Sequence, residues 1–109
     1  MAVVLLASPG YSEPFRCVSK TPYTSIKKTC EVKYKSADRL QIFGLYPDNQ
    51  VLTVDLRRNN TYSLQNEYWS EGVPTGSIVS NTEGSYFKDG RDLVLTNEIG
   101  LIKISPLRD

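Results

Sequence analysis

The sequence predicts an α+β domain in which a single helix packs on a twisted, mostly antiparallel β-sheet. Three observations lead to this fold class. The chain has 109 residues, which is enough for one domain with its own core. Residues 24–35 carry apolar side chains at a helical spacing. The residues after Asp38 form short apolar runs separated by turn residues, which is typical of a sheet.

Residues 1–10 are expected to form an N-terminal extension, separate from a single domain at 11–109. Residues 2–7 are the longest apolar run, and Pro9 and Gly10 then interrupt the chain. The run is either the remnant of a signal peptide or a first strand. It is far shorter than the roughly 20 residues that cross a bilayer, so no membrane segment is expected.

A short strand and then the helix are expected at the start of the domain. Residues 15–18 alternate like a strand, which Pro22 ends. Thr24 or Ser25 can cap a helix, and its buried face would carry apolar residues at i, i+4 and i+8, namely Ile26, Cys30 and Tyr34. Val32 lies off this face. An alternating strand through positions 30, 32 and 34 fits the same residues, so that alternative stays open.

Seven short strands are expected after Asp38. Each apolar run is about as long as a single strand, and glycine, proline and asparagine separate the runs. The expected strands are 40–45, 51–56, 61–64, 77–79, 85–87, 93–95 and 101–104.

The two cysteines, Cys17 and Cys30, are expected to form a disulfide that ties the first strand to the helix. An even pair in a small chain fits an oxidising compartment. Two separate buried thiols are the alternative. Neither a metal site nor a cofactor is expected, because two sulfurs without any histidine leave only carboxylates to complete a metal shell.

The segment 16–39 is strongly basic, although the whole chain has a net charge of only +1. It carries seven basic and two acidic residues. Lys27, Lys28 and Lys35 are therefore candidates for weak contacts with RNA phosphates. The alternative is a helix face that simply faces water.

A second candidate surface lies at residues 66–74, where two large aromatic side chains occur in a polar, turn-rich stretch. Tyrosine and tryptophan anchor protein interfaces, because they bury a large area at low entropy cost. Tyr68, Trp69 and Glu71 are therefore expected to contact a partner protein. A lid over one end of the sheet is the alternative.

Three short motifs, in this order, resemble a family of fungal effectors. They are Phe15-Arg16-Cys17, the spacing from Ile26 to Cys30, and Tyr46-Pro47. The set is similar to the RNase-like proteins associated with haustoria, which powdery mildew fungi secrete. The resemblance implies the fold of the secreted guanyl-specific microbial ribonucleases. It also implies delivery into the host cell, where plant proteins, an intracellular immune receptor among them, would be the partners.

The residues that perform catalysis in those ribonucleases are missing here, since the chain has no histidine. By resemblance, Tyr46 keeps the family's tyrosine and Asp48 replaces a histidine. Ser63 replaces the base glutamate and Leu93 the phosphate-binding arginine. An aspartate repels phosphate, and a serine hydroxyl is too weak a base to act unaided. These four residues would line a vestigial cleft with no catalytic residue in it.

The expected function is therefore that of a secreted effector that is not an enzyme and acts by binding host macromolecules. A monomer is expected. Two alternatives remain open: an active ribonuclease or ribotoxin with displaced catalytic groups, and an unrelated secreted β-rich inhibitor or adhesin. A fold without the order of helix and then sheet would favour the last of these.

Overall fold

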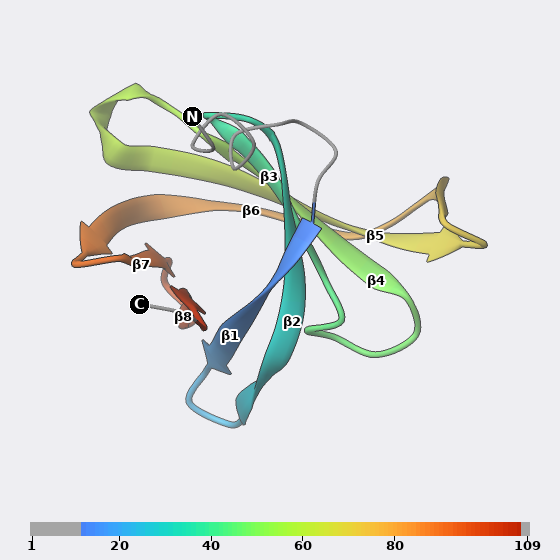
Figure 1. Ribbon diagram of the computed structural model, residues 1–109, viewed down its shortest axis with the longest axis horizontal. Coiled ribbons are helices and arrows are strands. Elements are labelled where there is room, and N and C mark those ends of the chain that lie inside the picture. The colour runs from blue at the N-terminus through green and yellow to red at the C-terminus, as the bar shows by residue number, and fades with distance from the viewer. Residues whose placement is uncertain (1–11, 108–109) are drawn as a thin grey trace.

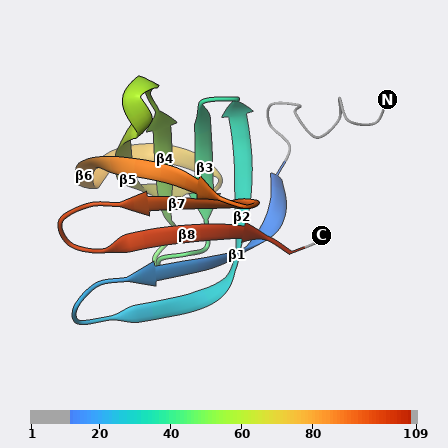
Figure 2. The ribbon, with the colours of Figure 1, turned by 90° about the vertical axis from the view of Figure 1, so that its left-hand side faces the viewer.

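The computed structural model describes residues 12–107, in which eight antiparallel strands close into a barrel (Figures 1 and 2). Each strand pairs with the next along the chain, and the last strand pairs with the first. The strands are β1 (Ser12–Lys20), β2 (Ser25–Ser36), β3 (Arg39–Phe43), β4 (Gln50–Leu56), β5 (Thr61–Ser70), β6 (Val73–Asp89), β7 (Asp92–Thr96) and β8 (Leu101–Pro106).

The predicted α+β fold class is wrong. Among residues 12–107 the single helical segment is a 3-10 turn, Arg58–Asn60, and no helix packs on a sheet. The ribonuclease-like order of a helix and then a sheet is therefore not present in this part of the chain. The predicted extension at residues 1–10 lies outside the described residues. Within them, no helix has the length and apolar character that crossing a membrane requires.

The predicted helix is strand β2, and the alternative interpretation of the same residues is the correct one. Cys30 and Val32 are buried, whereas Glu31 between them is exposed, as on a strand with one face inside. Glu31 pairs with Phe43 of β3, and Val32 with Ile42. The apolar spacing 26, 30, 34 has an even period, so it suits a strand as well as a helix.

Apolar side chains fill the end of the barrel at which β2 turns into β3, β4 into β5 and β6 into β7. On β2 and β3 the buried residues alternate with exposed or half-buried ones, whereas β7 buries Leu93, Val94 and Leu95 in succession. The fully buried members include Leu40, Val54 and Ile104. Burying one such side chain stabilises the fold by about 1.5–3 kcal/mol, so this end supplies much of the driving force for closure.

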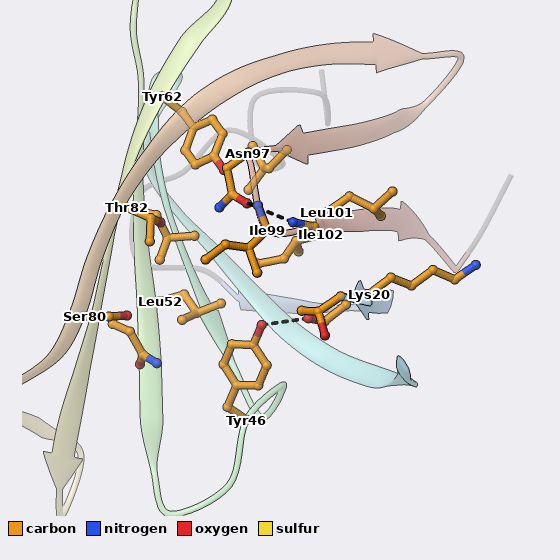
Figure 3. A pocket seen from close by; sticks show the side chains of 16 residues that line it. Lys20, Tyr46, Leu52, Tyr62, Ser80, Thr82, Asn97, Ile99, Leu101 and Ile102 are labelled. Atoms are coloured by element: carbon orange, nitrogen blue, oxygen red, sulfur yellow. Dashed lines mark hydrogen bonds between the residues drawn. The ribbon is translucent and has the colours of Figure 1, made fainter. Parts of the chain in front are cut away.

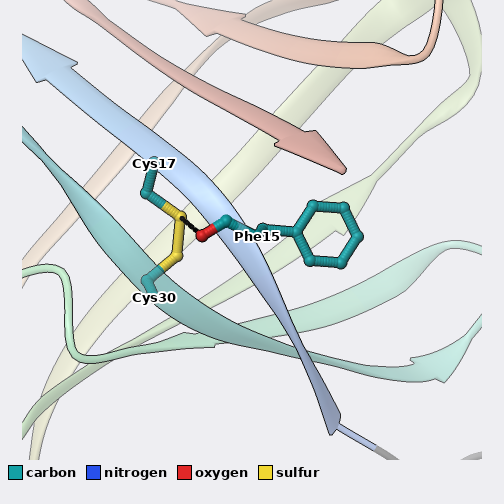
Figure 4. Close-up of a disulfide and its surroundings, with 3 residues drawn as sticks. All are labelled: Phe15, Cys17 and Cys30. Atoms are coloured by element: carbon teal, nitrogen blue, oxygen red, sulfur yellow. Dashed lines mark hydrogen bonds between the residues drawn. A yellow bond between two sulfur atoms is a disulfide. The ribbon is translucent and has the colours of Figure 1, made fainter. Parts of the chain in front are cut away.

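The structure contains the disulfide between Cys17 and Cys30, and it joins β1 to β2 (Figure 4). The two Cα atoms are 5.9 Å apart, and both side chains are buried in the barrel core. The two residues are diagonal neighbours, because Cys30 pairs with Phe15 while Cys17 pairs with Lys28. The crosslink thus ties two adjacent strands, and not a strand to a helix.

Strand β6 is longer than its partner β7, and this leaves one of its edges free. Two strands were expected at 77–79 and 85–87, but both belong to β6. Its pairing with β5 begins at Val73, whereas its pairing with β7 covers only Ser85 to Asp89. Its first part therefore forms, with the end of β5, a hairpin that projects from the barrel (Figure 1).

Candidate functional site

A cavity of about 160 Å³ occupies the other end of the barrel, where β1 turns into β2, β3 into β4 and β7 into β8 (Figure 3). Its lining runs from the core to the surface, since Leu52 is 1% exposed and Ile99 is 61% exposed. The lining is mixed in character. The apolar part includes Leu52, Leu64, Leu95 and Ile102, and the polar part includes Ser19, Tyr46, Tyr62, Asn66, Ser80, Thr82 and Asn97.

Asn66 is the most unusual residue of this lining, because it is polar, 6% exposed and only half satisfied. Its side-chain Nδ2 donates a hydrogen bond of 2.7 Å to Gln50 Oε1. Its Oδ1 is buried and has no hydrogen-bond partner within residues 12–107. Such an orphaned acceptor costs about 1–3 kcal/mol, so the fold maintains it at the expense of stability. A buried oxygen of Gln41 is also without a partner there, but Gln41 lies in an outer groove beside Arg39 and Trp69.

Two hydroxyl groups of the lining meet each other. Ser19 Oγ and Tyr46 Oη lie 2.7 Å apart and share a hydrogen bond. Ser19 is 3% exposed and sits at the inward position of β1 that follows Cys17. The pair fixes the tyrosine of the β3–β4 loop against β1, so the loop is held at the rim of the cavity.

Asn97 shapes the rim on the side of the β7–β8 turn. Its Oδ1 accepts hydrogen bonds from the backbone amides of Ile99 and Gly100, at 2.7 and 2.9 Å. Burial raises the pKa of Tyr62, and the nearby Tyr46 adds to this, while a hydrogen bond with Asn97 opposes the shift. The phenol of Tyr62 therefore keeps its proton at neutral pH.

The mouth of the cavity lies beside the free edge of β6. Ser80 and Thr82 come from the part of β6 that precedes its pairing with β7, so no strand covers the cavity beyond them. Gly100 approaches the carbonyl of Lys20 so closely that a Cβ atom there would collide with it. Among the described residues that line the cavity, Lys20 is the only charged one. Figure 3 shows its side chain extending away from the cavity.

This arrangement suits binding better than chemistry. Its polar groups are neutral hydroxyls and amides, and these can donate and accept hydrogen bonds but do not exchange protons readily near pH 7. In the described part of the chain, no group of three or more acidic, cysteine or histidine side chains could hold a metal ion.

The structure does not bring the four residues of the predicted vestigial cleft together. Tyr46 lines the barrel cavity, and Asp48 lies in the β3–β4 loop with a left-handed backbone. Leu93 is buried inside the barrel. Ser63 is half-buried and lines a separate groove with Arg39 and Glu83.

The predicted protein-contact residues lie together at the end of β5 and in the turn that follows it. Trp69 packs edge-on against Phe43, with ring centroids 5.3 Å apart and an interplanar angle of 88°. Its backbone amide donates to Asn49 O at 2.9 Å. Tyr68 is exposed, and Glu71 occupies the turn with a φ of 53°. Trp69 therefore packs on the outer wall of the barrel and also lines an open groove. Glu71 lines the same groove.

The predicted RNA-binding lysines all lie on β2, which separates them. Lys27 and Lys28 are consecutive on a strand, so their side chains point to opposite faces. Lys35 is eight positions beyond Lys27, or about 26 Å along an extended strand. Lys27 and Lys35 thus share one face of β2 but lie far apart on it, and Lys28 is on the other face, so the three lysines do not form one compact basic patch.

Sequence reasoning missed Ser19, Asn66 and Asn97 as site residues. A signal for one of them was present, because Tyr62, Leu64 and Asn66 occupy alternate, inward positions of one strand. A polar residue at the third position of such a series is unusual enough to mark a polar region inside the barrel.

The comparisons with known proteins found no relative of this chain. The chain matches no known protein-family model, no curated protein sequence and no solved structure.

Proposed function

We propose that the protein is a secreted, noncatalytic binding protein that holds one small molecule in the open end of its barrel. The observation that carries the proposal is the cavity of about 160 Å³, whose lining runs from the buried Leu52 to the exposed Ile99.

The architecture supports this proposal. A barrel of eight strands is wide enough either to be filled by side chains or to hold one small ligand. Here the filled part and the cavity share a wall, because Leu52, Leu64 and Leu95 belong to the core and also line the cavity. The alternation of the strands supplies the mixed lining that ligand pockets use, with a few polar groups among apolar ones.

The noncatalytic part of the proposal rests on the side chains available. The chain has no histidine, so the commonest general acid and base is missing. Burial raises the pKa of Tyr62, so the phenol keeps its proton near neutral pH and is not available as a base. The disulfide in the core is compatible with an oxidising compartment and hence with secretion.

A cavity-filling variant and its neighbour on the other face test this function. Thr82→Phe places a ring in the cavity, whereas Asn81→Phe places the same ring on the outside of β6, one residue away. We expect fragments of six to ten heavy atoms to shift amide resonances of the wild-type chain and of Asn81→Phe. Thr82→Phe should abolish these shifts while keeping a folded spectrum. Equal binding by both variants, or none by the wild type, would remove the proposal.

Protein recognition by the β5–β6 hairpin is a second candidate. Its apolar side chains are unusually exposed, at 58% for Val73, 44% for Ile78 and 41% for Val79. Tyr68 lies on the same hairpin, next to Trp69. An exposed apolar cluster of this kind is typical of an interaction surface. The interpretation as a fungal effector with plant targets stays a prediction from the sequence motifs, now without the ribonuclease scaffold.

Affinity purification from leaf tissue can separate the two candidates. The hairpin variant Ile78→Ser with Val79→Ser should lose a plant partner that the wild type and Thr82→Phe both retain, because only the hairpin has changed. A partner that Thr82→Phe loses and the hairpin variant retains would argue against the hairpin. It would instead assign recognition of the plant partner to the mouth of the cavity.

A further inference from the structure

We infer that the outer face of strands β8, β1 and β2 docks on the surface of an anionic lipid membrane. This surface is separate from the cavity, and the inference does not depend on the proposed binding function. Two features carry it, namely a group of basic side chains around Val18 and two exposed hydrophobic side chains in the neighbouring turns. The basic residues, which we call the basic wall, are Arg16, Lys20, Lys27 and Lys103.

The register of the sheet gathers the basic wall around one point. Val18 of β1 pairs with Lys27 of β2 on one side and with Lys103 of β8 on the other. Arg16 and Lys20 lie two positions before and two positions after Val18 on the same strand. Paired residues share a face, as do alternate residues of one strand, so all five side chains point outward. The residues between them on β1 are buried on the inner face.

The four charges are close enough to attract one anionic surface together. Two strand spacings, or about 9.5 Å, separate the backbones of Lys27 and Lys103. Four residues, or about 13 Å, separate Arg16 from Lys20. Each of these backbone positions is within one Debye length of Val18, since that length is about 10 Å in 0.1 M salt.

Little negative charge offsets the basic wall. Lys103 forms an ion pair of 3.6 Å with Asp92, and the other three basic residues form no ion pair among residues 12–107. Glu31, the acidic residue on the outer face of β2, is four positions or about 13 Å from Lys27. The whole chain has a net charge of only +1, so its attraction for an anionic surface is concentrated on this face.

Two hydrophobic side chains lie beside the basic wall. Tyr23 in the β1–β2 turn is 93% exposed and Ile99 in the β7–β8 turn is 61% exposed, and no other large hydrophobic side chain among residues 12–107 is as exposed. The two turns are neighbours at one end of the barrel, because Lys20 pairs with Leu101 (Figure 2). Anionic headgroups attract the basic residues, and the membrane interface accepts the hydrophobic ones.

The same face lacks the groups that other anionic partners require. Single-stranded RNA stacks its bases on aromatic side chains, and none of the outward positions of β1, β2 and β8 is aromatic. A protein interface is usually centred on large buried anchors, whereas the centre here is Val18 with charges around it. A lipid surface needs only the positive charge and the exposed turns.

Vesicle flotation with the full 109-residue chain tests the inference. Vesicles of equal parts phosphatidylcholine and phosphatidylserine should bind the protein in about 0.1 M salt. They should release it in about 1 M salt, where the Debye length falls to about 3 Å. Vesicles of phosphatidylcholine alone should bind at least about tenfold more weakly, because they offer no net negative charge.

Two matched variants locate the binding surface. The wall variant, Arg16→Gln with Lys27→Gln, should bind the mixed vesicles about 30-fold more weakly, which corresponds to about 1 kcal/mol for each charge. The distant-lysine variant, Lys33→Gln with Lys35→Gln, changes the net charge equally on strand β2. Its charges are about 20 Å or more from Lys27, so binding should weaken less than about threefold.

A second pair of variants tests the hydrophobic turns. Tyr23→Ser with Ile99→Ser should weaken binding to the mixed vesicles about tenfold, because two side chains no longer enter the interface. Phe87→Ser is the control, since Phe87 is 51% exposed but lies at the filled end of the barrel, and it should bind as the wild type does. If the wall variant does not fold, Lys20→Gln with Lys103→Gln replaces it.

Several outcomes would overturn the inference. Equal binding to neutral and mixed vesicles would mean that charge has no part in it, and no binding to either would exclude the membrane. An equal loss in the wall and distant-lysine variants would assign the attraction to the whole molecule. Binding of polyuridylate that the wall variant loses, without binding of vesicles, would assign the basic wall to nucleic acid instead.

Discussion

The two ends of the barrel are built from the same strands but have opposite character. At the end where β2 turns into β3, the interior is apolar and filled, with Leu40 and Val54 fully buried. At the end where β1 turns into β2, strands β1 and β5 contribute Ser19 and Asn66 to the lining of a cavity. A step of two residues, from Cys17 to Ser19, is enough to change from core to site.

This difference shows how a small barrel can combine stability with binding. The closed end and the disulfide fix the positions of all eight strands. The open end can then carry polar residues and an orphaned acceptor without losing the fold, because the cost is offset elsewhere in the same strands. Variants at the two ends should therefore affect different properties.

The largest expected effect on stability comes from the filled end. Leu40→Ala should lower the free energy of unfolding by about 2–5 kcal/mol, because it removes a fully buried side chain and leaves a cavity. Urea unfolding measures this loss. The affinity for fragments that bind in the cavity should stay within twofold of the wild type in conditions where the variant is folded. A loss below about 1 kcal/mol would mean that this end is not tightly packed.

Removal of the disulfide should have the next largest effect. Replacing Cys17 and Cys30 together by alanine should lower the stability by about 3 kcal/mol, because the bond closes a loop with a sequence separation of 13. Comparison of the melting temperatures of the double variant and the wild type tests this. Unchanged melting would contradict this prediction, because it would mean that the crosslink does not restrict the unfolded chain enough to matter.

A smaller effect is expected from Gly100→Ala at the open end. The added Cβ would collide with the carbonyl of Lys20, so the β7–β8 turn must shift, at a cost of about 1–3 kcal/mol. The shift changes the rim, so the affinity for fragments that bind in the cavity should fall as well. Gly90→Ala is a useful comparison, because a Cβ at that turn meets no atom and only its φ of 66° is unfavourable. If both variants bound these fragments as the wild type does, Gly100 would have no role at the rim.

The smallest effect is a loss of stability in alkali. Burial raises the pKa of Tyr62 above its ordinary value of 10.0, so the folded state holds the phenolic proton more tightly than the unfolded state. The resulting stability is complete below about pH 10 and is lost as the pH rises towards the folded-state pKa. Tyr62→Phe should reduce this alkaline loss in urea unfolding at several pH values. Tyr23→Phe should not, since Tyr23 is 93% exposed.

Several strands could be predicted from the sequence, because their signals are local. The runs at 40–45, 51–56 and 93–95 are short, apolar and bounded by turn residues. Segment 25–36 could not be assigned in this way, since residues 26, 30 and 34 share a face in both a helix and a strand. Its pairing with Phe15 on one side and Phe43 on the other decides for the strand, and pairing between distant residues leaves no local pattern.

The site was less predictable than the strands for the same reason. Ser19, Asn66 and Asn97 come from three segments far apart in the chain, and only closure of β8 onto β1 brings them around one cavity. The prediction of a basic patch also depended on the secondary structure. Lys27 and Lys28 would share one exposed side of a helix, but they face opposite ways on β2.

Mapping of the fragment-binding site by amide chemical shifts tests the contrast between the two ends most directly. The account predicts that fragments of six to ten heavy atoms cause shifts at Ser19, Asn66, Asn97 and Gly100, which surround the cavity, and none at Leu40 or Leu93 in the filled end. Shifts centred on Phe43 and Trp69 in the outer groove, with the cavity residues unmoved, would contradict it.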